Sequence, residues 1–474
     1  MTLALAIGAA LLAGAAVAVW RRPALALFAF AVGLALHNLV MALLYGAGVR
    51  GSTLTAVAAW KEALLAVALA SVAWRALRQR RLPFLPGAVD ALALAFAGIV
   101  ALYAVLPQSA LGGEAGGEAV GRAFRELVLP VAAYLLGRSL LLDRRTLRRL
   151  GWTVVAAAGA VAAYGLADVY LVSLDWWRHS GAVGWFRDQL GFDYGRGLSG
   201  LPENFVFNPG NERPLRRLVS AFLSPLASGF MLAVALLVAA RLRRGWSAVP
   251  LLFAGLLWTH SRSVYVALGV ALLVLAAVAG RWWPVAAAVV AVGVGAAFVE
   301  AYPHFGPEAR FTPAELTVQR AQARSHPGVE HGPLSTGEPS FASHLRNLRD
   351  GLERVGRHPQ GYGLGNAGAV AKRSGVPILA GESNYSEIGV QTGVVGLALF
   401  LAWNLALLAV LARRRLALPA AALALVLALA VQTDAYGVPW LGYVVWAGCG
   451  VSLARARLGT AWRSIPESTS ATST

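Results

Sequence analysis

Arginine residues gather beside two apolar stretches of this chain in a way that suits phosphate binding. Arg213, Arg216 and Arg217 precede one stretch in "NERPLRRLVSAFLSPLASG", and Arg262 stands in "WTHSRSVYVA" between two others. A guanidinium presents a planar fork of donors that matches phosphate oxygens, and several together can hold a pyrophosphate without a metal ion. The turn around Arg262 also has a plainer explanation, because it could simply join two apolar helices.

Other ionisable residues stand inside or at the ends of apolar stretches. Each costs at least about 2.5–3.5 kcal/mol at the centre of a membrane helix, so it needs a partner or a role. We expect Lys61 and Glu62, in "VAAWKEALLAV", to neutralise each other, to pair across helices or to face a ligand cavity. Arg125 lies where a long side chain can reach the membrane surface, which makes it a further candidate phosphate ligand. Asp168 and Asp434 lie near helix ends, where each either binds an acceptor or is solvated.

The composition of the chain predicts that membrane helices position these residues. Of 474 residues, 58% are hydrophobic and 14% are charged, whereas soluble domains are about 45–50% apolar and about 25% charged. Mean hydropathy is +0.61, and long apolar runs recur from Met1 to Arg457. The sequence therefore predicts an all-α polytopic membrane protein, a single integral-membrane domain over residues 1–473.

The strong positive charge of the chain is explained by membrane orientation. The formal net charge is +18, which by itself could suggest nucleic-acid binding. The cations lie mainly in short loops between apolar runs, however, and there they set the orientation of the helices. Cys449 is the only cysteine, and no acidic cluster in the outside loops has the spacing of magnesium ligands. We expect neither a nucleic-acid partner nor a metal or other cofactor.

The apolar runs predict about twelve to thirteen transmembrane helices, since each crossing needs about 20 residues. We place them near residues 2–20, 24–47, 54–74, 84–107, 124–142, 150–173, 218–240, 246–259, 262–280, 283–301, 385–411, 417–433 and 438–454.

Basic clusters follow every second one of these helices, and this pattern orients the protein. They are Arg21-Arg22, "RALRQRR", "DRRTLRR", "RLRRG", Arg281, "RRR" and "RARLGTAWR". The alternate loops, such as "TDAYGVPW", are poor in cations. The positive-inside rule then puts the N-terminus outside and the C-terminus in the cytoplasm. Arg217 and Arg262 fall on the outer side, where orientation does not explain them.

Two outside loops are too long to be turns, residues 174–217 and residues 302–384. In the first, "DWWRHSGAVGWFRDQLGFDYGRG" mixes tryptophans with charges, which predicts an amphipathic segment lying on the outer membrane surface. The alternative is an ordinary solvated loop. The second loop contains "HPGVEHGPLSTGEPS", which is typical of disorder.

A helix follows that stretch in the second loop. Ser343 is a plausible N-cap, and Leu345, Leu348, Leu352 and Val355 recur at helical spacing on one face. The opposite face carries charged residues that include His344, Arg346, Arg349 and Arg357. The alternating glycines of "HPQGYGLGNAG", which comes next, permit tight backbone turns. The C-terminal "PESTSATST" predicts a short disordered tail.

Four segments in order resemble the O-antigen ligase and Wzy-type polymerase superfamily. "RLVSAFLSPLASG" is similar to an Arg-x-x-Gly-x-Phe-x-x-Pro signature, with Ser220 in place of the glycine. "THSRSVYVA" resembles a Thr-x-Ser-Arg-Ser element. "LRDGLERVGRHPQGYGLGNAG" is similar to an amphipathic helix followed by Pro-x-Gly-x-Gly-x-Gly. "ESNYSEIGVQTGVVGLALF" resembles a helix start preceded by Asn and Tyr.

The resemblance, which covers roughly residues 60–450, implies a membrane glycosyltransferase with a GT-C-like fold. Such enzymes take a glycan from undecaprenyl pyrophosphate on the outer face of the bacterial cytoplasmic membrane. They pass it to an acceptor, either lipid A core or another lipid-linked repeat. The matched motifs imply that Arg217 and Arg262 hold the pyrophosphate, with Arg216 and Arg125 as further cations. They place Asn384, Tyr385 and Arg346 on the acceptor side.

One departure from the family concerns the catalytic base. Ligases carry a histidine in a His-Asn-x-Tyr-Leu element, and the corresponding place here reads Glu382-Ser383-Asn384-Tyr385. His344 and Glu382 are therefore the two candidates for a base that activates a sugar hydroxyl. The alternatives are a surface histidine and a carboxylate that interacts only with a helix N-terminus.

The expected reaction is a direct displacement with inversion at the anomeric carbon, in which cations stabilise the departing pyrophosphate. The alternative is a transporter or flippase for lipid-linked sugars, which would predict inverted repeats and broken helices at matching places in two halves. Neither feature is apparent in the sequence. The large outside loop also favours an enzyme.

Overall fold

Nearly all of the chain folds into helices. The computed structural model describes residues 2–195, 197–208, 213–325 and 339–461, so most of "HPGVEHGPLSTGEPS" and the C-terminal tail lie outside the described residues. The helices are α1 (Thr2–Arg21), α2 (Leu25–Gly46), α3 (Gly51–Ala58), α4 (Trp60–Gln79), α5 (Ala88–Val105), α6 (Gly117–Arg138), α7 (Arg144–Leu171), α8 (Leu174–His179), α9 (Gly181–Gly184), α10 (Pro225–Ala239), α11 (Val249–Trp258), α12 (Arg262–Ala279), α13 (Trp283–Phe305), α14 (Pro313–Ser325), α15 (Pro339–Arg357), α16 (Gly368–Arg373), α17 (Asn384–Arg413), α18 (Ala417–Leu429) and α19 (Pro439–Ala461). Two short strands, β1 (Val206–Phe207) and β2 (Leu215–Arg216), pair antiparallel.

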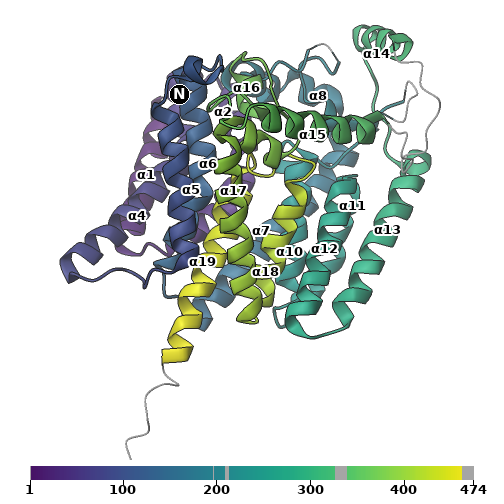
Figure 1. The fold of residues 1–474 in the computed structure, drawn as a ribbon. Helices are drawn as coiled ribbons and strands as arrows, with labels where there is room; N and C mark the ends of the chain where they lie inside the picture. The colour runs from purple at the N-terminus through teal and green to yellow at the C-terminus, as the bar shows by residue number, and fades with distance from the viewer. Residues whose placement is uncertain (1, 196, 209–212, 326–338, 462–474) are drawn as a thin grey trace, which may run out of the picture.

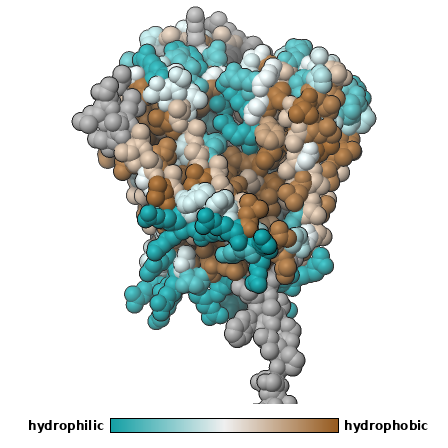
Figure 2. Space-filling view, turned by 90° about the vertical axis from the view of Figure 1, so that its left-hand side faces the viewer, coloured by the Kyte–Doolittle hydropathy of each residue, from teal (hydrophilic) through white to brown (hydrophobic). Residues whose placement is uncertain are grey.

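A helix occupies each of the thirteen positions expected from the apolar runs. Among the described residues, six helices are long and apolar enough to cross a membrane, or seven if α3 and α4, bent by 43°, form one span. Others, such as α10 and α18, are apolar but shorter. Figure 2 shows apolar side chains covering the middle of one face, with hydrophilic side chains at both ends. The prediction of an all-α polytopic membrane protein is confirmed.

The helices that do not cross the bundle gather at one end of it. Helices α8, α14, α15 and α16 lie at the end where α1 begins, and α19 ends at the opposite side (Figure 1). The two long loops expected on the outside are thus on one side of the bundle. We refer to it as the outer end.

Close helix packing in the bundle depends on small residues. A Cβ on Gly137 of α6 would lie 2.1 Å from the carbonyl oxygen of Ala447, and one on Gly450 of α19 would lie 2.3 Å from that of Tyr134. The backbones of α6 and α19 therefore touch, as small residues allow in membrane helices.

A buried ion pair joins α5 and α6 at the end of the bundle away from α15. Arg138 donates from Nε to Asp90 Oδ1 at 2.8 Å and from Nη2 to Oδ2 at 3.0 Å. The hydroxyl of Tyr134 and the backbone N–H of Gly87 donate to the same carboxylate. Both charged side chains are less than 5% exposed, so the pair is a fully satisfied internal group.

The segment expected on the membrane surface packs inside the protein instead. Trp177 and Trp185 are 0% and 2% exposed, and Phe186 is buried with them in a second core cluster against α2. Only Trp176 is substantially exposed, at 48%. Most aromatic residues of this segment thus belong to a protein core, and contact of the segment with the outer membrane surface stays a prediction.

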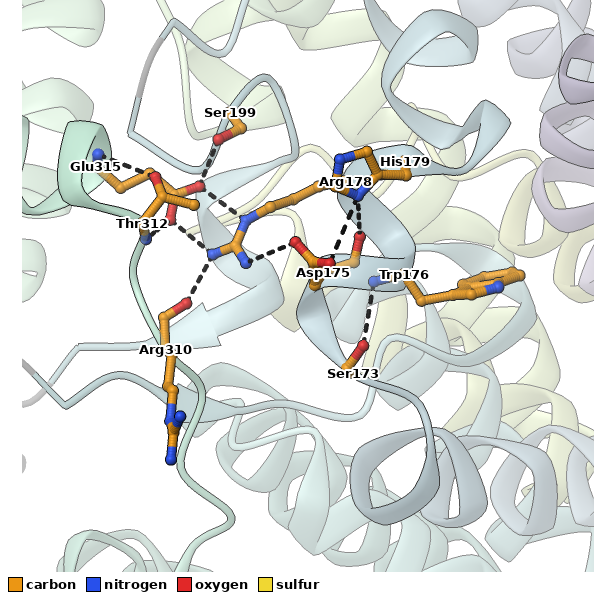
Figure 3. A network of polar contacts seen from close by, with 9 residues as sticks. All are labelled: Ser173, Asp175, Trp176, Arg178, His179, Ser199, Arg310, Thr312 and Glu315. Atoms are coloured by element: carbon orange, nitrogen blue, oxygen red, sulfur yellow. Dashed lines mark hydrogen bonds and ion pairs between the residues drawn. The ribbon is translucent and has the colours of Figure 1, made fainter.

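One buried carboxylate ties the two long outer segments together (Figure 3). Glu315 at the start of α14 accepts two hydrogen bonds from Arg178 of α8, at 2.9 and 2.6 Å. It also accepts bonds from the hydroxyl of Ser199 and the backbone N–H of Thr312. Arg178 in turn donates to the carbonyl of Arg310. This cluster fixes residues 174–199 to residues 308–325.

The glycine-rich loop after α15 fits into a break in α17. Gly393 has a φ of +68°, which interrupts the helix, and the backbone N–H of Val394 donates to the carbonyl of Pro359. Gly361 has a φ of +74°, and a Cβ there would lie 2.4 Å from the nitrogen of Gly393. The tight turns expected of "HPQGYGLGNAG" are confirmed, and they let two backbones meet.

Helix α15 differs from expectation at its start and on its apolar face. It begins at Pro339, so Ser343 lies inside the helix and not at its N-cap. Leu345 and Leu352 are 52% and 45% exposed, whereas Val355 is buried. A Cβ on Gly351 would lie 2.6 Å from that of Ser386 in α17. The contact with α17 forms through a glycine and its neighbours, since these permit a closer approach than the leucine face.

Candidate functional site

A cavity of about 500 Å³ opens within the bundle near its outer end. Its walls come from α2, α4, α6, α16, the turn after α9, the start of α10 and the loop between α18 and α19. Leu223, Ser224 and Ala227 of the "RLVSAFLSPLASG" segment contribute one wall.

Four cations line this cavity, namely Lys61, Arg122, Arg125 and Arg373. Burial, together with the nearby charges of Arg122 and Arg125, lowers the pKa of Arg373 to about 10. Arg373 therefore stays protonated at neutral pH but is repelled by two other guanidinium groups. Such a group of cations is stabilised by an anion that the three can share.

The positions of the cations follow from local contacts. Arg373 Nε donates to the carbonyl of Leu190 at 2.8 Å, and its guanidinium lies 5.4 Å from the ring centre of Phe192. Lys61 lies 3.4 Å from Glu62, and Arg125 lies 3.6 Å from the same carboxylate. Glu62 thus pairs with Lys61 of its own helix, α4, and with Arg125 of the neighbouring helix α6, and both kinds of pairing were expected. One carboxylate shared by two cations leaves positive charge for a ligand.

Three carboxylates line the same cavity: Glu118 of α6, which forms an ion pair with Arg122, Glu126 of the same helix, and Asp434 of the α18–α19 loop. Asp434 accepts hydrogen bonds from Asn384 Nδ2 at 3.0 Å and from the backbone N–H of Gly437 at 2.7 Å. Burial raises the pKa of Asp434. Asn384 also accepts from the backbone N–H groups of Ala435 and Tyr436, so its side chain holds this loop in place.

The motif arginines take up different positions. Among the described residues, the cavity lining includes Arg125 but neither Arg217 nor Arg262. Arg217 donates to the carbonyls of Thr259 and His260, at 3.0 and 3.2 Å, and burial lowers its pKa to about 10. It thereby joins the two family motifs, 217–229 and 259–267, to each other.

Arg216 is an internal residue rather than a surface cation. Its side chain is 3% exposed and donates to Asp168 Oδ2 at 3.2 Å, while Trp177 donates to the other oxygen of Asp168. The hydroxyl of Tyr302 donates to the Arg216 backbone carbonyl. The expectation that Arg216 meets a pyrophosphate does not hold here, because the protein itself supplies its anion. Asp168, likewise, is neither solvated nor open to an acceptor.

Ser220 and His260 adopt left-handed backbone conformations, with φ of +49° at each. This explains why the resembled signature has glycine at the position of Ser220. Ser220 is held there by a hydrogen bond from its hydroxyl to the carbonyl of Val161 at 2.7 Å. Burial lowers the pKa of His260 to about 3, so this imidazole is neutral at physiological pH.

The two candidate bases come together in the structure. His344 Nδ1 of α15 lies 2.9 Å from Glu382 Oε2, and Asn347 Nδ2 donates to the same oxygen at 2.8 Å. Glu382 holds a φ of +64°, a strained conformation for a residue with a side chain. The close contact with His344 lowers the pKa of Glu382 against the effect of partial burial. A carboxylate in this place can orient an imidazole as a proton acceptor.

This pair lies close to the cavity and to the start of α12. Glu382 precedes Asn384 by two residues, so their Cα atoms are at most about 7 Å apart, and Asn384 contacts the cavity residue Asp434. The backbone N–H of Asn384 also donates to Ala430 at the end of α18, a helix that packs along α12. Helix α12 begins at Arg262.

The remaining residues expected on the acceptor side differ in their surroundings. Tyr385 donates its hydroxyl to the carbonyl of Leu427 at 2.8 Å and packs against the core, which is a structural role. Asn384 is buried and fully engaged, as described above. Arg346 is exposed on α15. Of the three, Arg346 alone presents its side chain to solvent.

Sequence reasoning missed Arg122 and Arg373 as ligand-facing cations and Glu126 as a cavity carboxylate. Arg373 lies in the short helix "GAVAKR", which has no motif and no apolar period. Arg125 and Glu126 lie three and four residues after Arg122 on α6, and helical spacing could have placed both beside it. Among the described residues, no group of three or more His, Cys, Asp or Glu side chains is arranged to hold a metal ion.

Comparison with known protein families gives a match over part of the chain that includes several of these residues. No protein of curated function matches the chain. Residues 246–401, about a third of the chain, match the family model described as O-antigen ligase. The match runs from α11 into α17 and includes Arg262, His344, Arg373 and Glu382. This match supports the resemblance of the chain to the O-antigen ligase and polymerase superfamily.

Proposed function

We propose that the protein transfers a glycan from undecaprenyl pyrophosphate to an acceptor hydroxyl at the outer face of the bacterial cytoplasmic membrane. The observation that carries this proposal is the cavity, in which Arg122, Arg125 and Arg373 converge within apolar and aromatic walls. The arginines suit two linked phosphates. The apolar flanks suit the first units of a lipid tail.

In this proposal the pyrophosphate occupies the cavity and not the place of Arg217. The guanidinium of Arg217 already donates to two backbone carbonyls, so its role is to position the turn at Thr259 and His260. Arg262 begins α12 beside that turn and remains a candidate ligand at the edge of the site, where a helix N-terminus also favours an anion.

The reaction that these residues support is a single displacement. The acceptor oxygen forms a bond to the anomeric carbon as the bond to the pyrophosphate oxygen breaks, which inverts the configuration. The electron pair leaves with the lipid pyrophosphate, whose charge the arginines stabilise. The acceptor's proton passes to His344, which Glu382 orients through the 2.9 Å contact. No step in this scheme requires a metal ion.

The test is transfer by the purified protein with a polyprenyl-pyrophosphate-linked glycan and candidate acceptors, measured as released polyprenyl pyrophosphate. We expect Arg125→Ala and Arg373→Ala each to lower transfer by about tenfold or more, since each removes a charged hydrogen-bond donor. Lys372→Ala is the matched control, because Lys372 is the exposed neighbour of Arg373 and lies over the Tyr194 ring.

Two outcomes would contradict the proposal. If Arg373→Ala is as active as Lys372→Ala, the cavity does not hold the donor phosphates. If EDTA abolishes transfer, the metal-free displacement is wrong. Substituting His344 and Glu382 separately by Ala tests the base, and both variants should lose transfer while still binding the donor lipid. Arg262→Ala decides whether that residue contributes to the site.

A further inference from the structure

The basic cavity contains three acidic side chains; Glu118 forms an ion pair with Arg122, and a pyrophosphate does not need the other two. Glu126 and Asp434 line it together with Arg125 and Arg373. Carboxylates repel phosphate, so an anion site built for phosphate alone would be weakened by them. Their presence points to a ligand that also carries hydrogen-bond donors.

Unpartnered polar atoms support the same conclusion. Trp185 lines the cavity and is 2% exposed, and its indole Nε1 has no hydrogen-bond partner among the described residues. Asn204 also lines the cavity, and its Oδ1 has no partner within the described part of the chain. Buried polar groups are normally hydrogen-bonded, so each such atom calls for a partner. One is a donor and the other an acceptor, which together match a hydroxyl group.

The aromatic wall of the cavity adds a flat apolar surface. The rings of Phe192 and Tyr194 stack with centroids 5.5 Å apart and planes inclined by 16°. Both line the cavity beside Arg373. A flat aromatic face can pack against the C–H face of a sugar ring, while polar groups at its rim bind the hydroxyls.

We propose that Glu126 and Asp434 accept hydrogen bonds from hydroxyl groups of the sugar attached to the pyrophosphate, so that the cavity selects the first sugar of the donor as well as its phosphates. This inference rests on the proposed function, since it divides the same cavity into a phosphate part and a sugar part. The arginines bind every pyrophosphate lipid alike. The two carboxylates distinguish those that carry a hydroxylated sugar.

The experiment compares the binding of two lipids to the purified full-length protein in nanodiscs. The probes are polyprenyl pyrophosphate and the same lipid carrying one hexose. We expect the wild-type protein to bind the sugar-bearing lipid about tenfold more tightly, as hydrogen bonds to charged acceptors allow. Glu126→Gln and Asp434→Asn should each shrink this preference. Both should bind the sugarless lipid at least as tightly as the wild type, because an acidic side chain has been replaced by a neutral amide of the same size.

Retained binding of the sugarless lipid also shows that these variants are folded. Glu387→Gln is the matched control, because Glu387 is buried beside Asn384 but does not contribute to the cavity lining. It should keep the wild-type preference. The inference is overturned if the wild type binds both lipids equally, if the two cavity variants keep the preference, or if Glu387→Gln loses it to the same extent. Failure of the wild type to bind either lipid would refute the proposed function and this inference with it.

Discussion

Gly361→Ala should disturb the outer region through a single methyl group. Gly361 has a φ of +74°, in which an alanine costs about 1–2 kcal/mol relative to its preferred conformation. The new Cβ would lie 2.4 Å from the backbone nitrogen of Gly393 and 3.0 Å from its Cα. Because backbone atoms cannot rotate away as a side chain does, relief of this overlap requires movement of the loop or of α17, at about 1–3 kcal/mol. The sum is about 2–5 kcal/mol.

The loop that must move leads directly to α16 and Arg373, so the substitution should also affect transfer. We expect the unfolding temperature to fall and the transfer rate to fall by about tenfold or more, since small displacements of binding groups are costly. Hydrogen exchange should increase in residues 358–368 and around the α17 break. These three measurements separate a local displacement from global unfolding.

Gly356→Ala provides the control for this experiment. Gly356 lies in α15, and a Cβ there would meet nothing within 4 Å. Alanine is favoured over glycine inside a helix by about 0.5–1 kcal/mol, so this variant should be slightly stabilised and fully active. If the two variants have the same unfolding temperature and the same transfer rate, the contact between the glycine-rich loop and the break in α17 does not position the site. That result would refute the reasoning.

Three further predictions concern other parts of the structure. Asp90→Asn should destabilise the protein by about 3–5 kcal/mol because it leaves Arg138 buried without its counter-charge. Thermal unfolding in detergent measures this effect, and the unfolding temperature should fall less when both residues are replaced by leucine. Ser220→Gly should change the stability by less than about 1 kcal/mol, since relief of the left-handed conformation offsets the lost hydrogen bond to Val161; a large loss of unfolding temperature would contradict this. The pKa of Glu382 is lowered by His344, so the contact stabilises the fold above the ordinary carboxyl pKa of about 4.3 and is lost as the pH falls through the lower folded value. Unfolding midpoints of the wild type and Glu382→Gln should therefore differ at pH 7 and converge below about pH 4; a constant difference would refute the ion pair.

The sequence predicted the helices well because long apolar runs have few alternatives to a membrane helix. His344 and Glu382 were singled out separately as candidate bases, and the structure places them 2.9 Å apart. The sequence did not single out Arg373 as a cavity residue, because the position of a guanidinium depends on tertiary contacts that leave no pattern in the sequence. Arg217 donates to two backbone carbonyls and is absent from the cavity lining, whereas Arg373 donates to one, that of Leu190, and lines the cavity.

The amphipathic segment after α7 illustrates a second limit. Aromatic residues alternating with charges fit a membrane surface and a protein groove equally well. The sequence pattern alone does not tell which of these two environments the segment contacts. Trp177 and Trp185 are buried because α2 and the 198–205 region lie against them. Backbone strain at Glu382 was equally hidden, since a φ of +64° at a non-glycine residue leaves no mark in the amino-acid sequence.

The carboxylate of Glu315 has a consequence for how this chain can diverge. It is 0% exposed and neutralises Arg178, 137 residues earlier, while Ser199 and Thr312 complete its hydrogen bonds. Loss of either charge alone strands the other in the interior, whereas exchange of both for apolar residues is tolerable. Positions 178 and 315 should therefore covary across homologous sequences, with the pair kept or lost together. The two outer segments are in this sense inherited as one unit, although helices α10, α11, α12 and α13 separate them in the chain.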